Sequence, residues 1–175
     1  MDHFARLGLP AALDLEPASL DRAYFALQRQ WHPDRFVAKP AAERARASAE
    51  AAALNDAYRT LKDPLSRAVY LAELKGVELP SDGKTIDDPE LLMEALEARE
   101  ELHDAGSAQV VDALAAKVRD DMNASLHGLG SLFLAGDKPA IRKALLRLRY
   151  LDKFAEEARA RRTNIERANI ERGKT

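Results

Sequence analysis

The sequence predicts an all-α protein, with an antiparallel helical hairpin flanked by short helices in its N-terminal part and a three-helix bundle in its C-terminal part. Three observations lead to this prediction. Of the 175 residues, 46% are hydrophobic and 32% are charged, with much alanine, a balance that favours helices over sheets. Apolar residues recur at helical spacing in several long segments. No segment shows the alternation of polar and apolar residues that is typical of strands.

Residues 1–75 are expected to form the first helical unit. The apolar residues that share one face of its leading helix, at i, i+4, i+7 and i+11, are Leu20, Tyr24, Leu27 and Trp31. Pro17 and Ser19 supply a start signal, with Ser19 as the candidate N-cap. Pro33 ends the helix, because it lacks an N–H and forces the preceding residue out of helical dihedrals.

After a loop over residues 32–40, the alanine-rich stretch Ala41–Leu61 predicts a second long helix. Asp63 and Pro64 break it, and Leu65–Leu74 then resumes as a shorter helix. We expect the two long helices to lie antiparallel, joined at one end by the loop.

Residues 76–89 hold two glycines and two prolines among polar residues, which predicts a domain boundary and a fixed elbow. Residues 90–175 are expected to form the second domain, with a first helix over Pro89–Asp104. A long second helix and a third helix follow, separated by a break at Gly136 and Asp137. Short connections predict an antiparallel bundle. The apolar pattern of the last helix fades beyond Ala158, so residues 159–174 are expected to fray.

The composition argues against several classes of function. There is no cysteine, and the four histidines have no i,i+4 pairing, so we expect no metal site and no cofactor. A net charge of −2 gives no bulk attraction to nucleic acid or to an anionic membrane. No apolar run approaches the roughly 20 residues that span a bilayer, and the N-terminus lacks the features of a secretion signal. We therefore expect a cytoplasmic protein. We also expect it to be a monomer.

The tripeptide His32-Pro33-Asp34 has two interpretations. Proline and aspartate are ordinary turn residues, so the tripeptide could simply be a solvated turn that ends a helix. Alternatively, the loop is presented to a partner protein. The residues around the tripeptide favour the second interpretation.

Two ordered motifs resemble the J-domain co-chaperones. The stretch from Leu20 to Phe36, with Trp31-His32-Pro33-Asp34 near its end, is similar to the second helix and loop of that family, and the stretch from Leu54 to Pro64 is similar to the end of its third helix. Trp31 stands where Tyr is more usual, and Arg35 where Lys is more usual. The resemblance implies a J-domain over residues 1–75.

The resemblance also implies a partner and its contact residues. J-domains dock on an ATPase chaperone of the DnaK or HscA type and stimulate its ATP hydrolysis, without chemistry of their own. The residues implied to bind the chaperone are His32, Pro33, Asp34, Arg22, Arg29 and Arg35. Asp34 would accept a charge-assisted hydrogen bond from a chaperone arginine, and Arg22 and Arg29 would steer the encounter with an acidic surface. For these two arginines the alternative is a merely solvated helix face.

The segment that follows the boundary is unusually apolar. Leu92 and Leu96 do not share a helix face with Leu91, Ala95 and Leu102, so part of this apolar surface is expected to be exposed. Together with Met93, which suits adaptable contacts, the two leucines would form a patch beside acidic residues. The alternative is that both leucines belong to the bundle core.

The run from Leu92 to Leu102, the opening Met1-Asp2 with Phe4, Gly8 and Pro10, and the run Leu148-Arg149-Tyr150-Leu151-Asp152-Lys153 are together similar to the HscB co-chaperone family. That family implies an L-shaped arrangement of the two domains and a C-terminal domain that binds IscU, the scaffold for iron–sulfur cluster assembly. The positions matching the scaffold-binding surface are Leu92, Met93, Leu96, Glu97, Glu100, Asp104 and Tyr150. Asp104 stands where Glu is more usual, and its side chain has a shorter reach.

An enzyme is the competing class of function. The run from Gly130 to Lys138 superficially resembles a phosphate-binding loop, but its spacing is wrong and its middle continues a helix. The sequence therefore predicts a co-chaperone of iron–sulfur cluster biogenesis that stimulates an HscA-type chaperone and delivers an IscU-type scaffold to it. The alternative is a J-domain adaptor for a general DnaK-type chaperone with a different client.

Overall fold

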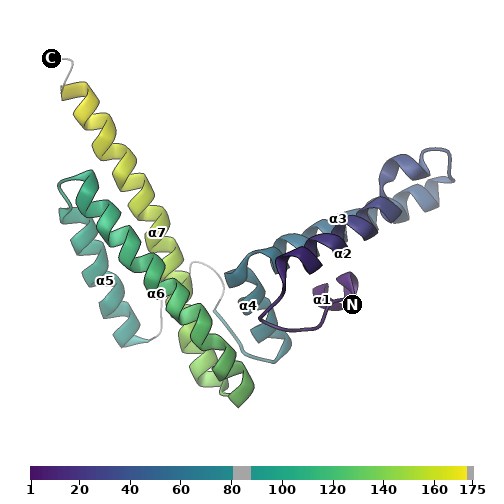
Figure 1. Ribbon diagram of the computed structural model, residues 1–175, viewed down its shortest axis with the longest axis horizontal. Helices are drawn as coiled ribbons and strands as arrows, with labels where there is room; N and C mark the ends of the chain where they lie inside the picture. The colour runs from purple at the N-terminus through teal and green to yellow at the C-terminus, as the bar shows by residue number, and fades with distance from the viewer. Residues whose placement is uncertain (81–87, 173–175) are drawn as a thin grey trace. The chain divides into compact units, whose positions relative to one another are not determined.

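The computed structural model describes residues 1–80 and 88–172, which contain seven α-helices, one short 3₁₀-helix and no strand (Figure 1). The predicted all-α fold is confirmed. The chain divides into two compact units, Met1–Gly76 and Val77–Thr175, and each is described by itself. Of the connecting segment predicted over residues 76–89, residues 81–87 lie outside the described residues. None of the helices described here combines the length and apolar character needed to cross a membrane.

The first unit is a helical hairpin with two shorter helices packed against it. Its elements are α1 (His3–Leu7), α2 (Pro17–Trp31), the 3₁₀-helix η1 (Pro33–Phe36), α3 (Ala41–Lys62) and α4 (Pro64–Leu74). Helices α2 and α3 lie side by side with η1 at their far end (Figure 1). The most deeply buried side chains of this unit come from all four α-helices: Phe4, Leu7, Leu20, Ala47, Leu54, Ala57, Leu61, Ala68, Leu71 and Ala72.

Aromatic side chains set the contact between α2 and α3. The rings of Tyr24 and Tyr58 stack with centroids 4.1 Å apart. The Tyr24 hydroxyl donates to Asn55 Oδ1 over 2.8 Å, and the Tyr58 hydroxyl donates to Asp21 Oδ1 over 2.7 Å. Because each ring is apolar in its body and hydrogen-bonded at its tip, the pair fixes how the two helices lie along each other.

Helix α2 begins earlier than the predicted N-cap. Glu16 is the N-cap residue and Pro17 is the first helical residue, where the missing N–H of proline costs nothing. Ser19 lies inside the first turn, where its hydroxyl donates to the Glu16 carboxylate and accepts from Arg22. The prediction that Ser19 caps the helix is therefore wrong, because Pro17 already supplies the start.

Helix α4 begins at a well-made cap, which gives a test of stability. Asp63 Oδ2 accepts a hydrogen bond from the backbone N–H of Ser66 over 2.7 Å, and the Asp63 side chain is exposed. We expect Asp63→Ala to lower the free energy of unfolding of the first unit by about 1 kcal/mol. Asp63→Asn should retain most of this stabilisation, because asparagine also caps helices well. Urea denaturation followed by tryptophan fluorescence measures this, because the chain's single tryptophan, Trp31, lies in this unit. Equal stability of the alanine variant and the wild type would contradict it.

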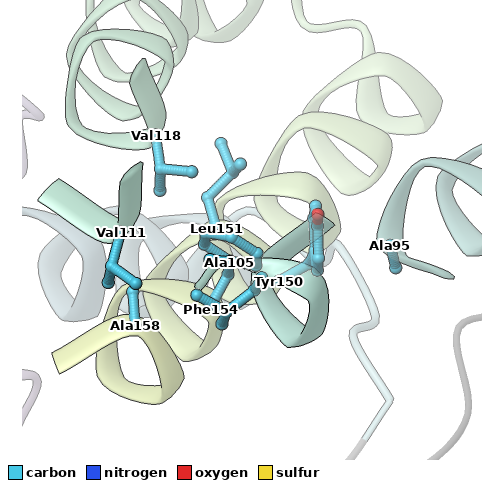
Figure 2. Close-up of a cluster of buried hydrophobic side chains, with 9 residues drawn as sticks. Ala95, Ala105, Val111, Val118, Tyr150, Leu151, Phe154 and Ala158 are labelled. Atoms are coloured by element: carbon cyan, nitrogen blue, oxygen red, sulfur yellow. The ribbon is translucent and has the colours of Figure 1, made fainter. Parts of the chain in front are cut away.

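The second unit consists of α5 (Pro89–Asp104), α6 (Ala108–Ala135) and α7 (Lys138–Arg172). Helices α6 and α7 pack along much of their length, and α5 lies against the same pair (Figure 1). Figure 2 shows the apolar cluster that joins the three helices. Its buried members are Ala95, Leu102, Ala105, Val111, Val118, Tyr150, Leu151, Phe154 and Ala158.

Ion pairs hold α5 along α7. Lys143 Nζ lies 2.7 Å from the Glu90 carboxylate and 3.2 Å from that of Asp88. One helical turn further on, Arg147 donates to Glu94 over 2.7 Å. The Leu91 backbone N–H, with the Lys143 ammonium, holds the pKa of the N-cap residue Asp88 below its usual range. The side of α5 that faces α7 is therefore fixed by charge as well as by apolar contact.

Helix α7 extends to Arg172, so the prediction that residues 159–174 fray is wrong for residues 159–172. Beyond Ala158, Ile165 still packs against the apolar cluster, and polar contacts of two arginines add to it. Arg161 donates to the backbone carbonyls of His103 and Ala105 at the end of α5. Arg162 pairs with Asp112 of α6 over 2.7 Å and with Glu166 one turn along. This segment is therefore held by arginine contacts together with one apolar side chain, Ile165.

Candidate functional site

The His32-Pro33-Asp34 loop lies at the junction of α2 and η1, where the sequence placed it. His32 leaves the helix with φ −59° and ψ 128°, as a residue before proline should. Its Nδ1 accepts a hydrogen bond from the Asp34 backbone N–H over 3.3 Å. The turn is thus stabilised from within by a bond that does not use the Asp34 carboxylate.

Asp34 is the one acidic residue of the loop over residues 32–40. Its side chain is 86% exposed, and Oδ2 lies 3.6 Å from His32 Nδ1. Within the described residues no lysine or arginine pairs with it at 4 Å or less. An exposed carboxylate without a lysine or arginine partner among the described residues is well suited to accept a charge-assisted hydrogen bond from a partner's arginine.

The three arginines that are predicted to bind the chaperone lie on α2 and in η1. Arg35 donates to the backbone carbonyl of Arg29 over 3.1 Å, which ties η1 back to α2. Arg29 is exposed, and Arg22 is 70% exposed while within 3.4 Å of Glu16. Sequence reasoning missed Phe25, whose side chain is 51% exposed between Arg22 and Arg29 on the same helix face. Its i+3 spacing from Arg22 was the signal that could have found it.

The apolar patch on α5, defined as Leu92, Met93 and Leu96, is exposed as expected. The three side chains are 37%, 57% and 47% exposed. Leu91 and Ala95, on the other side of the helix, are 3% and 4% exposed. The alternative that Leu92 and Leu96 belong to the bundle core does not hold. Their role in binding stays a prediction.

Acidic side chains continue the patch toward the end of α5. Glu97, Glu100 and Asp104 are all exposed, and Asp104 lies 3.2 Å from His103 Nδ1. A shallow hollow of about 630 Å³ opens beside them, between the end of α5 and the start of α6. Its lining residues are Glu97, Glu100, Glu101, Asp104, Ala105, Gly106, Val110 and Leu114. An apolar patch with an acidic border fits a partner surface that is apolar and basic.

Tyr150 does not join this exposed patch. It is only 8% exposed, lies in the apolar cluster near Ala95 (Figure 2), and its hydroxyl donates to the Glu94 carbonyl over 3.3 Å. Burial, with the nearby Glu94 carboxylate, raises the pKa of Tyr150 to about 12. In this structure Tyr150 supports the helix that carries the patch from beneath. Helical spacing in the sequence did not distinguish a buried Tyr150 from one exposed in the patch.

The raised pKa predicts an alkaline weakness of the second unit. The neutral phenol is favoured in the folded state, so its contribution is fully present below about pH 10 and is lost as the pH rises through about 12. Between about pH 10 and pH 12, we expect the free energy of unfolding of the Tyr150→Phe variant to fall less than that of the wild type. Urea denaturation at several alkaline pH values measures the loss, and the difference in tyrosinate absorbance between the two proteins gives the titration of Tyr150. Identical alkaline profiles would contradict the prediction.

The structure offers little for the competing functions. In residues 1–80 and 88–172 no group of three or more His, Asp or Glu side chains is placed to hold a metal ion. Gly130 lies inside α6, which runs to Ala135 and ends at Gly136 in a left-handed conformation with φ 68°. The backbone N–H groups that a phosphate-binding loop would present are therefore used within a helix.

Comparison with known families accounts for both units. Residues 2–70 match the family model described as the DnaJ domain, and residues 87–159 match that of the HSCB C-terminal oligomerisation domain. A co-chaperone protein HscB homolog from Burkholderia multivorans is 41% identical over 167 residues, which cover 94% of this chain and 95% of that protein. The corresponding protein from Burkholderia vietnamiensis is 40% identical over the same length.

Solved structures give the same result. The chaperone HscB from Vibrio cholerae is 32% identical with a TM-score of 0.82, covering 94% of this chain and 99% of that one. Human co-chaperone protein HscB is 28% identical with a TM-score of 0.85, covering 91% of this chain and 81% of that one. With a DnaJ domain, an HscB C-terminal domain and a relative above 40% identity along nearly its whole length, the chain belongs to the HscB family of J-domain co-chaperones.

Proposed function

We propose that this protein is a co-chaperone of iron–sulfur cluster biogenesis. Its first unit stimulates ATP hydrolysis by a specialised HscA-type chaperone, and its second unit delivers an IscU-type scaffold protein to that chaperone. The observation that carries the proposal is the presence of two exposed surfaces of different chemistry, one on each unit, in a chain that matches HscB co-chaperones along nearly its whole length.

The chaperone-binding surface is built from charge. Asp34 is an exposed carboxylate without a lysine or arginine partner among the described residues, and the turn beneath it is fixed by the Asp34 N–H to His32 bond. Arg22 and Arg29 lie on the α2 face that leads to the loop. An acidic surface carrying an arginine is the complementary partner, with the α2 arginines speeding the encounter and Asp34 making the specific contact.

The scaffold-binding surface is built from apolar area with an acidic border. Leu92, Met93 and Leu96 provide the apolar contact, and Glu97 and Glu100 provide the charge. Asp104 extends the acidic border to the end of α5. Burial of the patch supplies binding energy, and the acidic border selects a scaffold face with basic side chains.

The protein works in this proposal as an adaptor and leaves the ATP chemistry to the chaperone. It acts as a monomer in the cytoplasm and requires no cofactor, nucleic acid or membrane. Once the scaffold is bound to one unit and the chaperone to the other, the second encounter becomes intramolecular, and the effective concentration of the scaffold at the chaperone rises.

The proposal is tested with purified partners. Calorimetric titration of an IscU scaffold into the protein should show binding, and the protein should raise the ATPase rate of an HscA chaperone. The same ATPase assay is repeated with DnaK in place of HscA. Stimulation of DnaK without any scaffold binding would favour the general adaptor, and binding of ATP to the protein alone would favour a nucleotide-binding function.

A further inference from the structure

Three side chains from three elements meet at the base of the His32-Pro33-Asp34 loop. Trp31 is the last residue of α2, Phe36 is the last residue of η1, and Arg46 lies in the second turn of α3. The rings of Trp31 and Phe36 are nearly parallel, at 5°, with centroids 6.0 Å apart. The Arg46 guanidinium lies over the Trp31 ring, 5.4 Å from its centroid.

The stacked rings belong to residues on either side of the tripeptide in the sequence. Trp31 immediately precedes the tripeptide and Phe36 follows it by two residues, so their stacking closes the turn in which Asp34 lies. Arg46 then joins this closed turn to α3 through a cation–π contact. Without Arg46, the loop keeps the Arg35 bond to the Arg29 carbonyl and the packing of η1 against α3, but its aromatic pair loses the cation–π contact that fixes the Trp31 ring to α3.

We propose that Arg46 is a positioning residue for Asp34, acting through the Trp31–Phe36 stack. The inference rests on the proposed stimulation of an ATPase chaperone. Arg46 holds the loop in the orientation in which the Asp34 carboxylate meets the chaperone, and its loss lowers the fraction of molecules that are ready to bind. Apparent affinity falls with that fraction, while the rate at saturation is unchanged.

The chain carries its own reporter for this arrangement. Trp31 is the single tryptophan, so intrinsic fluorescence reads only the ring under Arg46. In the free protein, we expect Arg46→Ala to make Trp31 more accessible to acrylamide quenching, and Arg46→Lys, which retains a cation, to restore most of the protection. Arg44→Ala is the matched control, because Arg44 is also an exposed arginine at the start of α3 but points to another side of the helix.

The ATPase assay completes the test on the full chain. Arg46→Ala should raise the concentration of protein needed for half-maximal stimulation of HscA by up to about fivefold, with the maximal rate unchanged. Arg46→Lys should fall between this variant and the wild type, and Arg44→Ala should match the wild type. Weaker stimulation with unchanged Trp31 quenching would overturn the inference, because Arg46 would then contact the chaperone directly. Unchanged half-maximal concentration would also overturn it. Absence of stimulation by the wild-type protein would overturn the proposed function itself.

Discussion

Replacing Asp34 with alanine should remove most of the stimulation of the HscA ATPase at the concentration at which the wild type is half-maximally active. The Asp34 carboxylate is 86% exposed and has no lysine or arginine partner among the described residues, so it is available for a chaperone arginine. A hydrogen bond to a charged group contributes about 1.5–3 kcal/mol, which corresponds to a roughly 10- to 150-fold loss of apparent affinity. Steady-state ATP hydrolysis by HscA, with the co-chaperone titrated, measures this loss.

The Asp34→Ala variant should otherwise behave as the wild type. Circular dichroism and the affinity for IscU should be unchanged, since the Asp34 side chain is 86% exposed and the patch proposed to bind the scaffold lies on α5. Glu73→Ala removes an exposed carboxylate from α4 of the same unit and should leave stimulation intact. Full stimulation by Asp34→Ala would refute the proposed role of the loop.

The second large effect is expected at the α5 patch. The Leu92→Ala and Leu96→Ala double variant removes two side chains that are 37% and 47% exposed. Because only the exposed part of each is left to be buried by a partner, each contributes about 1 kcal/mol, and the two together give a roughly 30-fold loss of affinity for the scaffold. Calorimetric titration of IscU measures it. Stimulation of the ATPase without scaffold should be unchanged.

Leu134→Ala is the matched control for the double variant. Leu134 is 91% exposed near the end of α6, on the same unit but on another helix, so its loss removes comparable apolar surface away from the patch. We expect it to bind IscU as the wild type does. Equal affinity of the double variant and the wild type, with both folded by circular dichroism, would show that the scaffold binds elsewhere.

Much of the fold follows from local sequence signals. The boundaries of α3 and α5 agree closely with prediction, because Pro40, Pro64 and Pro89 each mark where a helix can begin. The continuation of α7 beyond Ala158 was not predictable in this way. Arg161 and Arg162 fix its first turn to partners some fifty residues away, at the end of α5 and in α6, and local periodicity carries no record of such contacts.

In the candidate sites, too, some features follow from local sequence and others depend on contacts between helices. Exposure of Leu92 and Leu96 followed from the helical period, since the opposite face already had its apolar residues. The burial of Tyr150 and the stacking of Arg46 on Trp31 depend on where a second helix lies, which the spacing within one helix does not specify. These two positions therefore required the tertiary structure.

Helix α5 separates two requirements that often conflict. Its buried positions, such as Leu91 and Ala95, and its ion pairs to α7 maintain the bundle, while the alternate positions Leu92 and Leu96 face outward. Substitutions at the outward positions leave no cavity in the core. Over evolutionary time this helix is therefore free to change in step with a drifting partner surface, with little cost to the stability of the domain that displays it.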